Sequence, residues 1–139
     1  MSDLEPPVAR GKFEVTLVPA DEGRPDDPLG RRTIAKTFHG DLEATSRGQM
    51  LTAMTPVDGS AGYVAIEEVT GSLRGRAGSF ILQHDGVMDR GLPKLSVVVV
   101  PDSGTGALRG ITGSMEIVVA DGEHSYEFRY FLPEPEVSP

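Results

Sequence analysis

The chain contains no cysteine and no tryptophan, and only 6% of its 139 residues are aromatic. Without cysteine it can have no disulfide framework, no thiolate nucleophile and no zinc–thiolate site. It also lacks any apolar run near the roughly 20 residues that a membrane-spanning helix needs. The first residues, Met-Ser-Asp-Leu-Glu-Pro-Pro, lack the basic segment and apolar core of a signal peptide. These absences predict a cytoplasmic protein that has no contact with a membrane.

Positive charge is scarce as well. The chain has 13 basic and 21 acidic side chains, a net charge of −8 and a pI of about 4.8. Proteins that bind the phosphate backbone of nucleic acids need a cationic surface, so nucleic acid is not an expected partner. The acidity is best interpreted as a contribution to solubility.

Glycine and proline, in contrast, are abundant, with 17 and 11 residues. They divide the chain into segments too short for typical helices, which average about eleven residues. The segments alternate apolar and polar residues and are rich in β-branched and aromatic types, which is typical of strands. We therefore expect an all-β fold, with a flexible arm at residues 1–10, one domain at residues 11–132 and a polar tail at residues 133–139.

Eight strands are expected, at residues 12–18, 32–46 (with a bend at Gly40), 49–55, 63–70, 79–84, 94–100, 112–120 and 124–132. Strands paired in sequence order form an antiparallel meander, which must close into a barrel or fold into a sandwich to bury one face. Short turns favour the barrel. The prediction is a single closed eight-stranded antiparallel β-barrel with little or no helix.

Two stretches of the chain resemble each other. The sequence Gly-Ser-Leu-Arg-Gly-Arg-Ala-Gly-Ser-Phe at residues 71–80 matches Gly-Ala-Leu-Arg-Gly-Ile-Thr-Gly-Ser-Met at residues 106–115. The shared Leu-Arg-Gly centre predicts two hairpins built alike.

The stretch from Leu95 to Val100 is apolar on both faces, although no helix is expected to cover its outer face. It predicts a homo-oligomer interface, with the N-terminal arm as the alternative cover. The three histidines, His39, His84 and His124, are isolated in the sequence and show no metal-ligand spacing. No metal and no cofactor is therefore expected.

Glu67 and Glu68 form the only adjacent acidic pair inside an apolar run. Neighbouring strand residues face opposite sides, so one of the two points inward if the strand is regular. Burial raises the pKa of a carboxyl, and perturbed acids occur at functional sites as well as in structural ion pairs. Both interpretations stay open here: a functional acid, or a glutamate paired with Arg47, Arg74 or Arg76 at the barrel rim.

Four ordered stretches of the chain carry a family resemblance. They are residues 39–43 (His-Gly-Asp-Leu-Glu), 63–67 (Tyr-Val-Ala-Ile-Glu), 75–84 (Gly-Arg-Ala-Gly-Ser-Phe-Ile-Leu-Gln-His) and 101–110 (Pro-Asp-Ser-Gly-Thr-Gly-Ala-Leu-Arg-Gly). Over residues 13–132 the chain resembles a bacterial family known as domain of unknown function 3224. Its members look like the allene oxide cyclase barrel, which often assembles into oligomers. Glu67 falls in the family's Tyr-x-x-x-Glu stretch, so the resemblance favours Glu67 over Glu68 as the inward acid.

The resemblance implies a barrel that confines a reactive apolar substrate, as allene oxide cyclases, dirigent proteins and polyketide cyclases do. We expect a barrel that binds a small apolar or amphipathic molecule, with a cofactor-free cyclase or isomerase as its catalytic version. The alternatives are a carrier without catalysis and a structural oligomer. Glu67 is the candidate catalytic residue, and the candidate binding residues are Tyr63, Gln83, His84, Glu43, Met50, Phe80 and Phe128.

Overall fold

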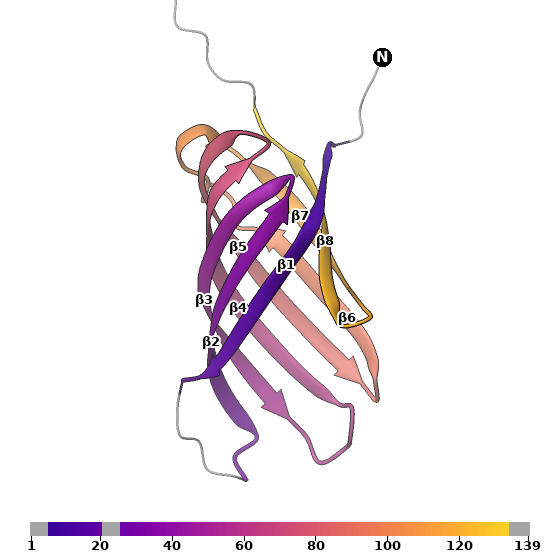
Figure 1. Ribbon diagram of the computed structural model, residues 1–139. Coiled ribbons are helices and arrows are strands. Elements are labelled where there is room, and N and C mark those ends of the chain that lie inside the picture. The colour runs from indigo at the N-terminus through magenta and orange to yellow at the C-terminus, as the bar shows by residue number, and fades with distance from the viewer. Residues whose placement is uncertain (1–5, 21–25, 134–139) are drawn as a thin grey trace, which may run out of the picture.

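The computed structural model describes residues 6–20 and 26–133, and these form a closed antiparallel barrel (Figure 1). Its strands are β1 (Val8–Pro19), β2 (Leu29–Gly40), β3 (Leu42–Met54), β4 (Ala61–Leu73), β5 (Arg76–Asp89), β6 (Leu92–Val99), β7 (Thr112–Ala120) and β8 (Glu123–Phe131). Each strand pairs with the next, and β8 pairs with β1. The predicted eight-stranded barrel is confirmed. No described helix is long and apolar enough to cross a membrane.

Several strand boundaries differ from the expected ones. Gly40, with φ of 106°, ends β2 and belongs to the turn before β3, so it is not a bend inside one strand. Residues 42–46 and 49–55, expected in two strands, instead lie in β3, which continues through Gly48. β1 begins at Val8, which assigns Val8–Arg10 to the barrel and not to the expected arm. Residues 1–5 of that arm and 134–139 of the expected tail lie outside the described residues.

Side chains alternate between the barrel interior and its surface, as the sequence predicts. Phe13 on β1, Phe38 on β2 and Phe128 on β8 are all buried in the interior. The aromatic face of β8 is therefore part of the core, where Phe128 stacks on Phe80 with ring centroids 5.6 Å apart. The interior also contains polar residues halfway along the barrel.

One end of the barrel, here called the closed end, is sealed by the turn at Arg74 and by the loop between β6 and β7. This loop contains a short 3-10 helix (Gly106–Leu108), and its Leu108 and Ile111 are buried. Thr105 fixes the loop to β5, because its hydroxyl accepts the Ser79 N–H at 3.0 Å.

The two Leu-Arg-Gly stretches are not built alike. In the first, Arg74 and Gly75 both have positive φ and form a two-residue hairpin turn between β4 and β5. In the second, Arg109 has φ of −60° and follows the 3-10 helix. The shared feature is the leucine, since Leu73 and Leu108 are each 1% exposed at the closed end.

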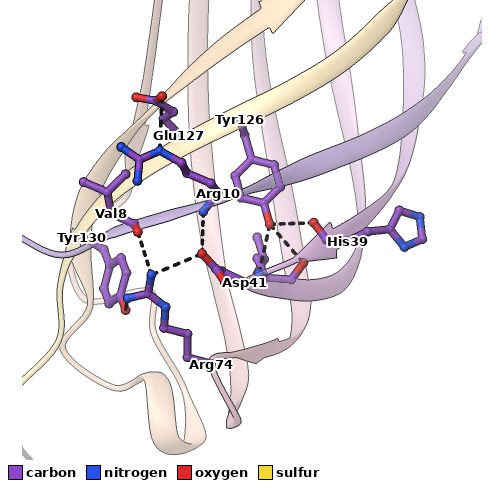
Figure 2. A network of polar contacts seen from close by, with 9 residues as sticks. Val8, Arg10, His39, Asp41, Arg74, Tyr126, Glu127 and Tyr130 are labelled. Atoms are coloured by element: carbon purple, nitrogen blue, oxygen red, sulfur yellow. Dashed lines mark hydrogen bonds and ion pairs between the residues drawn. The ribbon is translucent and has the colours of Figure 1, made fainter.

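Polar contacts tie the closed end together (Figure 2). Arg74 donates to the Val8 carbonyl at 2.8 Å and to Asp41 Oδ2 at 3.2 Å, and Asp41 also accepts the Arg10 N–H. The Tyr126 hydroxyl donates to the His39 carbonyl at 2.9 Å and accepts the Leu42 N–H. These contacts join β1, β8 and two turns, so a ligand would have to enter elsewhere.

The opposite end, here called the open end, is less tightly closed. β6 and β7 pair through one residue pair, Val98 with Ser114, whereas β4 and β5 pair along their whole length. No ladder therefore joins the first half of β6 to the second half of β7. Leu92, Leu95 and Val119, in these two halves, are exposed.

Candidate functional site

A cluster of four polar side chains lies inside the barrel, one from each of β2, β3, β4 and β5. Glu67 at its centre is 0% exposed. Its Oε1 accepts a hydrogen bond from the Ser46 hydroxyl at 2.7 Å. Its Oε2 accepts one from Lys36 Nζ at 2.8 Å and lies 2.5 Å from His84 Nε2. Glu67 is thus the inward acid, while Glu68 faces outward and pairs with Arg47.

Strand register brings the four side chains together. Lys36 pairs with Ser46 across β2 and β3, and His84 pairs with Ala65, two residues before Glu67 on the same face of β4. Gly48 is the direct partner of Glu67, and a Cβ on Gly48 would lie 2.8 Å from the Glu67 Cβ. Real Cβ atoms do not approach so closely, so glycine lets β3 and β4 draw together beside the acid.

The partners of Glu67 decide its protonation state. Burial raises the pKa of the Glu67 carboxyl, but the hydrogen bond from His84 and the charge of Lys36 outweigh it and lower the pKa from 4.5 to about 2. The carboxyl is therefore ionised at neutral pH and can only accept hydrogen bonds, so the proton of the His84 contact belongs to Nε2. The expected rise of the pKa on burial is outweighed by these partners. The arginine partner, one of the two interpretations left open, was wrong, because Glu67 pairs with Lys36 and His84 and not with Arg47, Arg74 or Arg76.

Sequence reasoning missed two members of the cluster, Lys36 and Ser46, and Lys36 is the charged one. Its side chain is buried, and its Nζ lies 5.0 Å from the Phe13 ring centroid and 5.8 Å from that of Phe38. Both aromatic faces attract the ammonium and compensate part of its lost hydration. Alternation along β2 was the available signal, because Lys36 occupies the same face as the buried Ile34 and Phe38.

A cavity of about 410 Å³ opens at the open end, on the side of the cluster away from the closed end. Tyr63 links the two, because it lines the cavity and its ring centroid lies 6.3 Å from that of His84. Gly86, the register partner of Tyr63, provides the space for its ring: a Cβ there would lie 2.6 Å from Tyr63 Cε1. Burial and the charges of Glu67 and Asp85 raise the pKa of Tyr63 to about 12, so the phenol keeps its proton.

His84 has a second ring nitrogen, Nδ1, besides the Nε2 that contacts Glu67. Among the described residues His84 Nδ1 has no hydrogen-bond partner. Every buried polar side-chain atom in that part of the chain does have a partner. Nδ1 is therefore in contact with solvent, although His84 as a whole is buried. His84 itself is not among the residues that line the cavity, so the cluster adjoins the cavity through Tyr63.

The cavity wall is mainly apolar. It is lined by Arg32, Met50, Thr52, Met54, Ala61, Gly62, Tyr63, Gly86, Val87, Met88, Pro93, Lys94 and Leu95. Methionine side chains are flexible and polarizable, which suits a wall that adapts to different apolar shapes.

The other expected site residues divide into two groups. Met50 lines the cavity, as expected, whereas Phe80 and Phe128 stack in the core and do not form part of the cavity wall. Gln83 is exposed on the outer face of β5, and Glu43 accepts the Gly40 N–H at a turn near the closed end. Neither Gln83 nor Glu43 belongs to the candidate site. Within the described part of the chain, no three His, Asp or Glu side chains are placed to hold a metal ion.

Two comparisons with known proteins point to the same family. A family model described as a protein of unknown function, DUF3224, matches residues 9–130. A crystal structure of a DUF3224 protein of unknown function from Shewanella oneidensis MR-1 is similar, with a TM-score of 0.88 and 48% sequence identity. That similarity covers 94% of this chain and 100% of the Shewanella chain. The search of curated proteins found no match. Neither match bears on the resemblance to allene oxide cyclases, but the family itself is clear: the chain belongs to the DUF3224 family.

Proposed function

We propose that this barrel binds a small apolar or amphipathic molecule at its open end. The supporting observation is the cavity of about 410 Å³, apolar in its wall and adjoining the buried Glu67 cluster through Tyr63. Small-molecule sites range from roughly 300 to 1,000 Å³ and combine apolar walls with a few placed polar groups. The cavity has that composition, and the sealed closed end leaves the open end as the way in.

The site chemistry favours binding over proton transfer by Glu67. With a pKa of about 2, its carboxyl has no proton to donate at neutral pH, and its two oxygens already accept from three side chains. In the catalytic version, a cofactor-free cyclase or isomerase, Glu67 acts electrostatically by orienting His84. Tyr63, which lines the cavity, is then the group that touches the substrate, and His84 lies behind it.

A variant that fills the cavity tests the proposal. Ala61→Trp places an indole at the cavity wall, and Ala77→Trp, on the exposed outer side of β5, is the matched control. We expect wild type and Ala77→Trp to bind the neutral probe N-phenyl-1-naphthylamine with a rise in its fluorescence, and Ala61→Trp to lose this binding. Native mass spectrometry of protein from its own host is expected to show a retained small molecule in wild type. Equal probe binding by Ala61→Trp and wild type would contradict the proposed site.

We also propose that the barrel forms a homo-oligomer through its outer face. Within the stretch from Leu95 to Val100, Val97 and Val99 point into the barrel, and Leu95 and Val98 are exposed, with Val98 on the outer face. On the same outer face, beyond Gln83 of β5, further exposed apolar residues lie on β4 and β3, namely Val64, Ile66 and Leu51. Exposed apolar patches of this kind mark contact surfaces.

Ile66→Lys is therefore expected to shift the protein to monomers, because a charge in an apolar interface is costly to desolvate. Thr70→Lys, on the same outer side of β4, is the control and should leave the assembly unchanged. Size-exclusion chromatography with light scattering measures both. A monomeric wild type at micromolar concentration would refute the oligomer.

A further inference from the structure

The cavity at the open end has an unusual charge for this acidic protein. Most basic side chains in the described part of the chain are paired, as in Lys12 with Glu123 or Arg47 with Glu68. Over residues 6–20 and 26–133, three have neither a side-chain hydrogen bond nor an ion pair: Arg32, Lys94 and Arg109. Two of these three, Arg32 and Lys94, line the cavity.

No acidic side chain among the described residues lines the cavity to balance these two cations. The buried cluster below is already balanced, because Lys36 pairs with Glu67. Asp27, which shares a neighbouring hollow with Arg32, uses its Oδ1 to accept the Leu29 N–H at 2.9 Å. The cavity thus combines an apolar wall with uncompensated positive charge, in a chain whose net charge is −8.

Arg32 is placed to use that charge on a bound molecule. It lies on the same face of β2 as Ile34 and Lys36, both buried in the interior, so its side chain starts from the inner side of the barrel wall. Its register partner is Met50, which also lines the cavity. The guanidinium offers paired N–H donors in the geometry that a carboxylate or similar oxyanion accepts.

We infer that the ligand is an amphipathic anion, whose apolar body fills the cavity and whose oxyanion head pairs with Arg32 near the rim. Lys94 on β6 also borders the cavity, but it shares the outer face of that strand with Val98, so the contact with the oxyanion rests on Arg32. This inference rests on the proposed function and specifies the ligand class for the same cavity.

Two fluorescent probes that differ in one charged group test it. 1-Anilinonaphthalene-8-sulfonate carries a sulfonate on the same ring system as the neutral N-phenyl-1-naphthylamine. We expect the ion pair between Arg32 and the sulfonate to tighten sulfonate binding by roughly three- to tenfold. Arg32→Gln should therefore weaken sulfonate binding by about that factor and leave neutral-probe binding within about twofold. Arg109→Gln removes an equally unpaired cation beside the 3-10 helix, away from the cavity, and should change neither.

Salt gives a second readout on the unmodified protein. Raising the salt concentration to about 1 M shortens the screening length to roughly 3 Å, so sulfonate binding should weaken while neutral-probe binding persists. Near-UV circular dichroism of each sample shows that the probe reports on folded protein. Sulfonate binding unaffected by both Arg32→Gln and salt, with the neutral probe still bound, would overturn the anion inference and leave the proposed function intact. If neither probe binds folded wild type, the proposed function itself fails.

Discussion

Replacing Lys36 by methionine is expected to lower the free energy of unfolding by about 3–5 kcal/mol, because it leaves the buried Glu67 carboxylate without its cation. Methionine is similar in length to lysine, so the loss reflects the charge more than the packing against Phe13 and Phe38. Urea unfolding followed by far-UV circular dichroism measures the change, since the chain has no tryptophan to report by fluorescence.

Two further variants make this result specific. Lys12→Met breaks the exposed pair with Glu123 and should cost less than about 1 kcal/mol. The double variant Lys36→Met with Glu67→Gln carries no buried charge at these two positions and should recover roughly half of the loss. A double variant as unstable as the sum of its two single variants would show that the pair is not coupled.

The second large effect concerns acid stability. The pKa of Glu67 is lowered from 4.5 to about 2 in the folded protein. The ionised carboxylate therefore stabilises the fold fully above about pH 4.5, and that stabilisation is lost as pH falls toward 2. At roughly 1.4 kcal/mol per pH unit, this difference in pKa is worth on the order of 3 kcal/mol.

Glu67→Gln cannot titrate, so the stability advantage of wild type over Glu67→Gln should shrink by about 3 kcal/mol between pH 5 and pH 2. Unfolding free energies of both proteins across this range measure it. Asp41→Asn serves as the surface comparison, because the Arg10 N–H also lowers the pKa of Asp41 but this carboxyl is exposed. A constant difference between wild type and Glu67→Gln over the whole range would mean that Glu67 is not ionised by its partners.

The sequence by itself determined the barrel and its inside–outside pattern. Short segments with period-two alternation cannot form helices, and a meander of eight strands has to close on itself to bury one face. Alternation is a local property, because successive Cβ atoms along a strand point to opposite sides. It predicted that one of Glu67 and Glu68 faces inward, and the family resemblance favoured Glu67. The same alternation on β2 places Lys36 on the inner face.

Only the tertiary structure decided which residues Glu67 meets. Lys36 and His84 lie 31 and 17 residues from Glu67 along the chain, and strand register sets whether their side chains coincide. Register also places Gly48 directly opposite Glu67, where a side chain would not fit, whereas Gly40 lies in the turn after β2. The direction of the Glu67 pKa follows from these contacts, because burial alone would raise it and the assembled partners lower it. The cavity, likewise, is lined by residues of β2, β3, β4, β5 and β6 together, so no single strand encodes it.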